Sequence, residues 1–336
     1  MAGQNLKQKV EVFLFGCNDY NCYKMFSFKT IRCLFSIILL GGILICGSEA
    51  KAQSYTLLFE DQKAIYIVHL PVSYNKTKKY PLVLNFAGLG AGAKKHEEYC
   101  RMDEVADKKE FIVVYPQSYH KGWNTGLGFR RYEHGKDDLV YVNTLLDTLI
   151  KKYSVNTQRI YSVGVSLGGS FSYSLACEMS NRIAAVASVS GLMTDSALVY
   201  CNPTRDMPVL HFHGTHDHIM RYTGMHQARG VEQLIKLWVL RNHCANKPDT
   251  IHIPDRCKSD KSTMDLIKYS DCETGAEVWF YKVYKGGHTW PGSAKQFKML
   301  MGRKNKDING SEAIWEFFEK FTLQTGVAPY QPQVKK

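Results

Sequence analysis

The stretch "YSVGVSLGGS", residues Tyr161–Ser170, passes from a β-branched run into a segment of small residues. Ser166 lies at that transition, between Gly164 and Gly168. The sequence G-x-S-x-G between a strand and a helix is typical of a nucleophile elbow, in which a tight turn lifts the serine hydroxyl off the end of the strand. A larger side chain at either glycine would clash with the turn. The alternative is a glycine-rich turn without chemistry, so the rest of the chain must decide.

Apolar runs on both sides of this stretch alternate with helical segments. The predicted strands are residues 64–70, 82–86, 111–115, 159–165, 184–190, 208–213 and 278–284. The predicted helices are residues 137–153, 166–179, 230–242 and 311–321. This alternation indicates an α/β fold with a mostly parallel central sheet and helices on both faces. Ser166 then lies between a predicted strand and a predicted helix, as an elbow requires.

The bulk composition is that of an ordinary globular protein. The chain has 336 residues, of which 45% are hydrophobic, and a formal net charge of +12. Because the basic residues are scattered rather than clustered in a stripe, we interpret them as a solvated surface and not as a nucleic-acid site. We expect residues 53–336 to form a single domain.

The amino terminus is predicted to be a secretory signal peptide covering residues 1–52. Three basic residues precede the uncharged run Cys33–Ser48, and the A-x-A sequence Ala50–Ala52 follows it. This order is that of a cleavable signal, so we expect cleavage before Gln53 and a secreted or periplasmic protein. A retained membrane anchor is the alternative. Met25 would begin a signal of conventional length, so residues 1–24 are interpreted as an upstream extension that is not translated.

The partners of Ser166 are sought downstream, in the order serine, acid, histidine. Asp217 follows the predicted strand "PVLHFH" and a glycine-bearing loop, and His288 follows another strand and two glycines in "VYKGGHTWPG". We therefore predict Ser166 as nucleophile, Asp217 as the acid that orients the base and His288 as the base. Histidines crowd around Asp217, at His211, His213, His216 and His218. A metal cluster is the alternative interpretation of that crowd, but we expect neither a metal nor a cofactor.

These motifs together resemble a family of secreted α/β-hydrolases that includes polyhydroxybutyrate depolymerases and feruloyl or acetylxylan esterases. The resemblance covers roughly residues 60–322 and depends on "GWN", "DDLVYVNTLLDTL", "RIYSVGVSLGGS", "HGTHD", "GGHTWPG" and "DINGSEAIWEFF". It implies an oxyanion hole made by the backbone amides of Leu89 and Leu167. The family usually has His-Gly before the first of these amides, whereas this chain has Ala87 and Gly88, which puts the shape of the hole in question.

The resemblance also extends, loosely, to the cysteines. Six of the ten cysteines follow residue 52, and an even number in an oxidising compartment favours disulfides. The positions imply one pair between Cys177 and Cys201 and another between Cys244 and Cys272. Cys100 and Cys257 are left without an assigned partner.

The expected substrate is an ester linked to a carbohydrate. The loop 117–136 should line the pocket, with Trp123 and Trp290 as candidate substrate contacts; a packed structural tryptophan is the alternative for Trp123. Only 15 residues follow Phe321, so we expect no appended polymer-binding domain. That favours a serine carboxylesterase acting on feruloyl or acetyl esters of plant polysaccharide. The alternatives are a depolymerase of hydroxyalkanoate oligomers, a peptidase, and a non-catalytic binding protein on a hydrolase scaffold.

Overall fold

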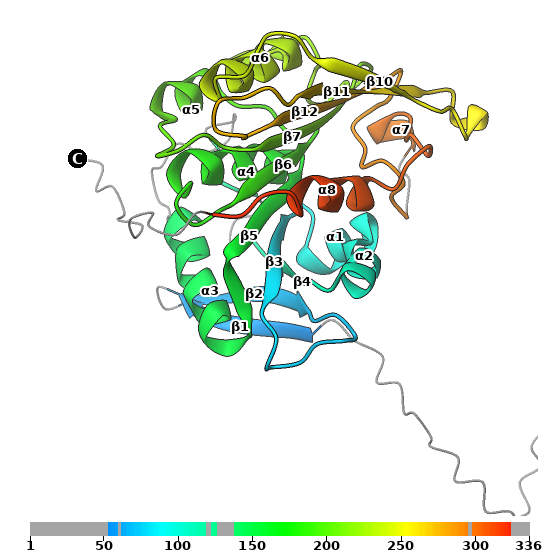
Figure 1. Ribbon diagram of the computed structural model, residues 1–336. Coiled ribbons are helices and arrows are strands. Elements are labelled where there is room, and N and C mark those ends of the chain that lie inside the picture. The colour runs from blue at the N-terminus through cyan, green and yellow to red at the C-terminus, as the bar shows by residue number, and fades with distance from the viewer. Residues whose placement is uncertain (1–52, 60–61, 119–121, 126–137, 295–297, 324–336) are drawn as a thin grey trace, which may run out of the picture. The chain divides into compact units, whose positions relative to one another are not determined.

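A ten-stranded sheet forms the centre of the structure, a computed structural model (Figure 1). The described residues are 53–59, 62–118, 122–125, 138–294 and 298–323. In chain order the strands of this sheet are β1 (Gln53–Phe59), β2 (Gln62–His69), β3 (Tyr80–Phe86), β4 (Ile112–Pro116), β5 (Val155–Val165), β6 (Ala185–Val189), β7 (Val209–Gly214), β10 (Asp249–Ile253), β11 (Thr263–Tyr269) and β12 (Val278–Tyr284). Two short strands, β8 (Gly224–Met225) and β9 (Ala228–Arg229), form a separate hairpin.

The strands are ordered β1-β2-β4-β3-β5-β6-β7-β12-β11-β10 across the sheet. The central part, from β4 to β12, is parallel, and an antiparallel pair of strands extends it at each side. Parallel strands have their carboxyl ends at one edge of the sheet, which is where α/β proteins place their functional loops. The predicted mostly parallel sheet is confirmed.

Helices cover both faces of the sheet. They are α1 (Ala93–Cys100), α2 (Met102–Lys109), α3 (Asp138–Lys152), α4 (Leu167–Glu178), α5 (Asp195–Tyr200), α6 (Val231–Arg241), α7 (Lys298–Met301) and α8 (Gly310–Phe318), with a 3-10 turn at Lys258–Asp260. Side chains from α3, α4 and α6 share one apolar core, and those from α1, α2 and α8 share the other (Figure 1). Strand β3 contributes to both, because Leu82 and Leu84 face the first core and Val83 faces the second.

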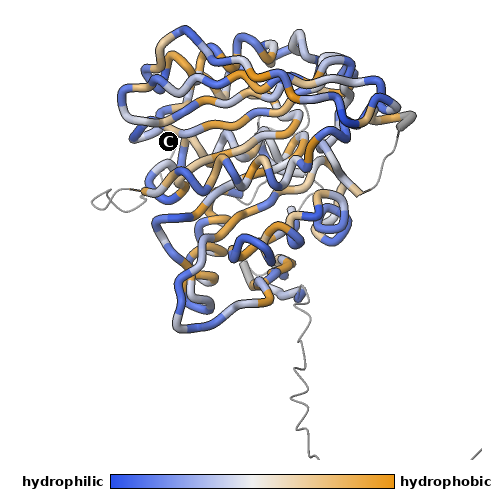
Figure 2. Tube along the Cα trace, turned by 45° about the vertical axis from the view of Figure 1, so that its right-hand side comes forward, coloured by the Kyte–Doolittle hydropathy of each residue, from blue (hydrophilic) through white to orange (hydrophobic). Residues whose placement is uncertain are grey.

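The strands of the central sheet are apolar on both faces, so the most hydrophobic segments run through the middle of the molecule (Figure 2). Each residue of β3, β4, β6 and β7 is buried. Strands covered by helices on both sides lose the alternation of polar and apolar residues that half-exposed strands show. This explains why continuous apolar runs located these strands in the sequence.

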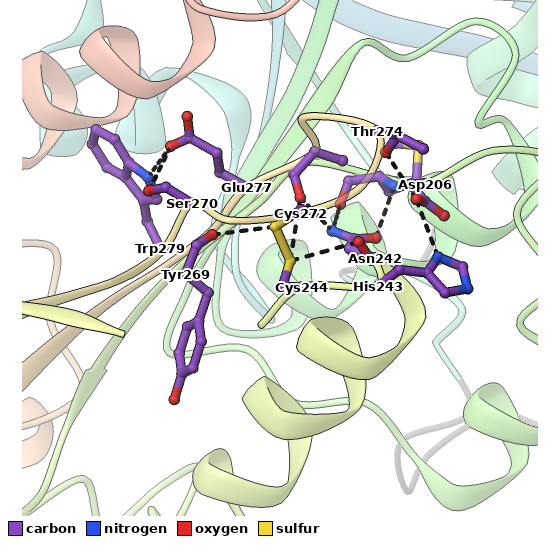
Figure 3. Close-up of a disulfide and its surroundings, with 12 residues drawn as sticks. Asp206, Asn242, His243, Cys244, Tyr269, Ser270, Cys272, Thr274, Glu277 and Trp279 are labelled. Carbon is purple, nitrogen blue, oxygen red and sulfur yellow. Dashed lines mark hydrogen bonds and ion pairs between the residues drawn. A yellow bond between two sulfur atoms is a disulfide. The ribbon is translucent and has the colours of Figure 1, made fainter. Parts of the chain in front are cut away.

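Two disulfides join segments that are distant in the sequence. Cys177, near the end of α4, is bonded to Cys201, which follows α5. Cys244, just after α6, is bonded to Cys272, in the turn between β11 and β12 (Figure 3). Both expected pairs are confirmed. Cys100 and Cys257 are free thiols, the first buried and the second partly exposed.

Polar bonds reinforce the second disulfide. The carboxylate of Asp206 accepts a hydrogen bond from Thr274 Oγ1 at 2.8 Å and lies 3.3 Å from Nδ1 of His243 (Figure 3). The end of α6 is thereby fixed to the turn that leads into β12. These contacts lie at the amino end of β12, the end opposite the loop of His288.

Candidate active site

Ser166 occupies a strained turn between β5 and α4. Its backbone has φ 57° and ψ −122°, a region that residues with a side chain rarely adopt. Two backbone bonds hold this conformation: the Ser166 amide donates to Val189 O at 2.8 Å, and Ser166 O accepts from Ser170 N at 2.9 Å. The turn presents the hydroxyl at the carboxyl end of β5, as the G-x-S-x-G pattern predicts.

The two glycines of the motif are required by close backbone contacts. A Cβ atom at Gly164 would lie 2.4 Å from the carbonyl of Gly168, and one at Gly168 would lie 2.2 Å from Phe86 O. Both separations are far below any real Cβ contact. The expected clash is therefore present, and it joins the elbow to the end of β3.

Asp217 and His288 form a buried pair. His288 Nδ1 lies 2.7 Å from Asp217 Oδ2, and both side chains are at most 2% exposed. The other oxygen, Asp217 Oδ1, accepts from the backbone amides of Ile219 and Met220, each at 2.9 Å. These three hydrogen bonds fix the carboxylate in the turn after β7.

The pairing defines the chemistry of His288. A carboxylate only accepts hydrogen bonds, so Nδ1 of His288 carries the proton and Nε2 is the basic nitrogen. The loop itself is held by its neighbours, since the His288 amide donates to Met301 O at 2.6 Å and the Gly287 amide donates to Arg303 O at 2.8 Å. His288 thus has the tautomer and the rigid support that a general base needs.

The sheet brings Ser166, Asp217 and His288 to one edge, but Ser166 and His288 do not form a hydrogen bond with each other. Strands β5, β6, β7 and β12 are consecutive neighbours, and Ser166, Asp217 and His288 each follow a carboxyl end. Among the hydrogen bonds of the described residues, none joins Ser166 Oγ to His288. Such bonds are often long in enzymes without substrate and shorten when substrate binds.

Two backbone amides next to Ser166 have no acceptor. Within the described part of the chain, neither the Leu89 amide nor the Leu167 amide donates a hydrogen bond, and Leu167 is the first residue of α4. A Cβ built on Gly88 would lie 3.8 Å from Ser166 Oγ, so the loop after β3 passes directly beside the hydroxyl. Amides at a helix start and in such a loop favour a negatively charged oxygen.

The Ala87 position is supported by a tryptophan. Ala87 is buried, and its carbonyl accepts a hydrogen bond from Trp123 Nε1 at 3.0 Å. The indole of Trp123 stacks on Phe171 of α4 with ring centroids 4.9 Å apart. One side chain therefore connects the loop of Leu89 to the helix that follows Ser166.

The expectation that the two tryptophans contact substrate is not supported. Trp290 is completely buried, and its Nε1 donates to Ser311 Oγ at 3.2 Å in the core. Trp123 is 4% exposed and packs as described above, which agrees with the structural alternative. Both indole rings are packed against other side chains, so neither tryptophan has a face open to a ligand. Residues 119–121 and 126–137 of the predicted pocket loop lie outside the described residues.

The histidine crowd around Asp217 divides into two kinds. His211 and His213 are fully buried on β7, whereas His216 and His218 are exposed. In the part of the chain that the structure describes, no group of three or more histidine, cysteine, aspartate or glutamate side chains could hold a metal ion. The sequence prediction missed the amides of Ile219 and Met220 and the contacts of His213; only the order of turn residues after β7 could have indicated them.

The predicted signal peptide, residues 1–52, also lies outside the described residues. Across the described ranges, no helix has the length and hydrophobicity needed to span a bilayer.

A serine, an acid and a histidine placed after the parallel strands β5, β7 and β12 of one sheet define an α/β-hydrolase. A family model described as "Putative esterase" matches residues 61–299, and the chain belongs to this esterase family. The fold is also similar to the solved structures of an acetyl xylan esterase from Aspergillus awamori (TM-score 0.57, 12% identity, covering 80% of this chain and 99% of that chain) and a thermostable esterase (TM-score 0.55, 16% identity, covering 81% and 63%).

Three curated proteins are similar in sequence. They are the bifunctional acetylxylan esterase/xylanase XynS20E of Neocallimastix patriciarum (27% identity, 78% of this chain and 34% of that protein), feruloyl esterase B of Piromyces equi (24%, 76% and 45%) and feruloyl esterase D of Neurospora crassa (26%, 81% and 87%). The chain spans about a third of the length of XynS20E, under half of feruloyl esterase B and most of feruloyl esterase D. The resemblance to feruloyl and acetylxylan esterases is confirmed.

Proposed function

We propose that this protein is a serine carboxylesterase that removes feruloyl or acetyl groups from plant polysaccharide. The observation that carries the proposal is the buried Asp217–His288 pair, 2.7 Å apart, at the same sheet edge as the strained Ser166. The names of the relatives supply the substrate class, since they are feruloyl and acetylxylan esterases.

The mechanism proposed is acyl transfer through Ser166. Nε2 of His288 takes the hydroxyl proton as Ser166 Oγ attacks the ester carbonyl, and Asp217 stabilises the resulting imidazolium. The amides of Leu89 and Leu167 donate to the oxyanion, each contributing about 3 kcal/mol of barrier lowering. The imidazolium then protonates the leaving alcohol. A water activated by His288 hydrolyses the acyl-enzyme, and no cofactor takes part in this scheme.

The proposed location is outside the cytoplasm, in the extracellular medium or the periplasm. Two disulfides support it, because disulfides persist in oxidising compartments. The predicted signal at residues 1–52 supports it independently.

The test compares the wild type with Ser166→Ala, both expressed in an oxidising compartment. Release of ferulate from methyl ferulate and of acetate from acetylated xylan is measured beside hydrolysis of hydroxybutyrate oligomers. We expect turnover of one plant ester and a loss of several powers of ten in Ser166→Ala. Turnover of the oligomers alone would replace the proposed substrate class. Equal rates in both proteins would refute catalysis by Ser166 and favour a binding protein.

A further inference from the structure

A row of buried rings lies next to the Asp217 carboxylate. The hydroxyl of Tyr173, on α4, is 2.8 Å from Nδ1 of His211, and Nε2 of His211 is 3.0 Å from Nδ1 of His213. Nε2 of His213 is 2.7 Å from Met220 O and 3.5 Å from Asp217 Oδ2. The proposed acyl-transfer scheme uses none of these three side chains.

The end of the row determines where every proton lies. Met220 O can only accept, so Nε2 of His213 carries a proton and Nδ1 of the same neutral ring must accept. Nε2 of His211 therefore donates to it, which leaves Nδ1 of His211 as the acceptor for the Tyr173 hydroxyl. All hydrogen bonds in the row point in one direction, from Tyr173 toward the turn of Asp217.

Burial keeps this direction in place. Both histidines are completely buried, and desolvation lowers the pKa of His211 well below its usual range and also lowers that of His213. The groups that face His213 are Asp217, His288, His211 and the ring of Tyr222. A neutral His213 donates from one fixed nitrogen, whereas a protonated ring would bring a second positive charge next to the imidazolium that forms on His288.

We infer that His213 is a positioning residue for the catalytic carboxylate, with His211 and Tyr173 fixing its tautomer. The inference rests on the proposed function, because it assigns Asp217 its role there. Met220 also donates its amide to Asp217 Oδ1 at 2.9 Å, so His213 holds the carbonyl of the same residue whose amide holds the carboxylate. His213 thus fixes the turn of Asp217 through Met220, and its Nε2 lies 3.5 Å from Asp217 Oδ2, the oxygen that is bonded to His288 Nδ1.

The kinetic test uses His213→Leu, which removes the donor, and His213→Gln, which restores an N–H and an acceptor. His69→Gln is the matched control, because His69 is equally buried and bonded to Asp107 at 2.9 Å, far along the sheet from Ser166. With an activated ester, we expect kcat of His213→Leu to fall about 10²-fold, the usual effect of a misplacement near 1 Å. KM should stay within about twofold, His213→Gln should recover most of the loss, and His69→Gln should keep the wild-type kcat.

A second measurement needs no variant enzyme to fold. Nitrogen-15 NMR of the histidine rings in the wild-type protein reports which ring nitrogen carries a proton. We expect protonation at Nε2 and not at Nδ1 for both His211 and His213 at neutral pH. Protonation of either ring at Nδ1 would overturn the inference.

The outcomes separate this inference from the proposed function. Normal wild-type turnover together with a wild-type kcat in His213→Leu would overturn the positioning role and leave the esterase assignment intact. A wild-type protein that neither hydrolyses esters nor labels Ser166 with a fluorophosphonate would overturn the proposed function and, with it, the positioning role. In that case the ring protonation states still decide whether the directed row exists.

Discussion

Replacing Gly168 by alanine should damage catalysis by displacing the end of β3. The new Cβ would lie 2.2 Å from Phe86 O and 2.7 Å from Ala87 O, and real Cβ contacts do not fall below 3.0 Å. The backbones of α4 and β3 must therefore separate by at least 0.8 Å at Phe86, the difference between 3.0 and 2.2 Å. Those carbonyls immediately precede Gly88 and Leu89, so the displacement moves the loop beside the Ser166 hydroxyl.

The expected loss of kcat is about 10²-fold. A misplacement near 1 Å has effects of this size, and removing one oxyanion donor altogether has a comparable one. Overpacking should also reduce the free energy of unfolding by about 1–3 kcal/mol. The assay is hydrolysis of an activated ester. The concentration of competent enzyme is measured by active-site titration, in which Ser166 reacts covalently with a fluorophosphonate.

Gly92→Ala is the control for the loss of a glycine near the same loop. Its Cβ would meet only the side-chain oxygen of Gln117, at 3.3 Å, and its backbone has an ordinary negative φ of −83°. This variant should keep nearly the wild-type kcat. A Gly168→Ala enzyme as active as Gly92→Ala would refute the reasoning that the elbow and the oxyanion loop are in rigid contact.

Two further predictions concern buried groups. Trp123→Phe removes the indole N–H that donates to the buried carbonyl of Ala87. It should lower the free energy of unfolding by about 1–3 kcal/mol, measured by urea unfolding, and kcat for ester hydrolysis by about tenfold. An unchanged kcat would contradict a supporting role for Trp123. Lowering the pH from 7 to 5 should destabilise the fold, because His96 and His211 stay neutral when folded but bind protons in the unfolded chain below about pH 6.5. Burial lowers the pKa of His96 to about 3, so its contribution is complete above about pH 6.5 and is lost as the pH falls toward 3, about 2 kcal/mol of it by pH 5. Burial raises the pKa of Asp103 to about 7, so this carboxyl is already protonated in the folded state at pH 5 and offsets part of the lost stability. The measurement is the midpoint of urea unfolding at pH 7 and at pH 5. The same midpoint at both pH values would contradict a net loss of stability.

The central strands and the site residues could be predicted because strong local patterns mark them. Continuous apolar runs located β3 and β5, and two glycines around Ser166 are needed by contacts that any such elbow makes. Helix α3 was equally visible, since its buried leucines recur at helical spacing.

Other elements carried no such pattern. Helices α1 and α2 are short, rich in charge and separated by Arg101 in a left-handed conformation, so no apolar period of useful length develops. Strand β10 is exposed over nearly its whole length at the sheet edge. Whether Trp290 faces a ligand or the core depends on packing against Ser311, which sequence spacing does not encode.

The Cys244–Cys272 bridge marks residues 245–271 as a segment with the geometry of an insertion. The two Cα atoms are 3.8 Å apart, which is the spacing of consecutive residues across a single trans peptide bond. Residues 245–271 thus depart from and return to one point of the backbone, as an inserted cassette does. A chain joined directly between those two positions would lose β10 and β11 and end its sheet at β12, with β7 still beside it.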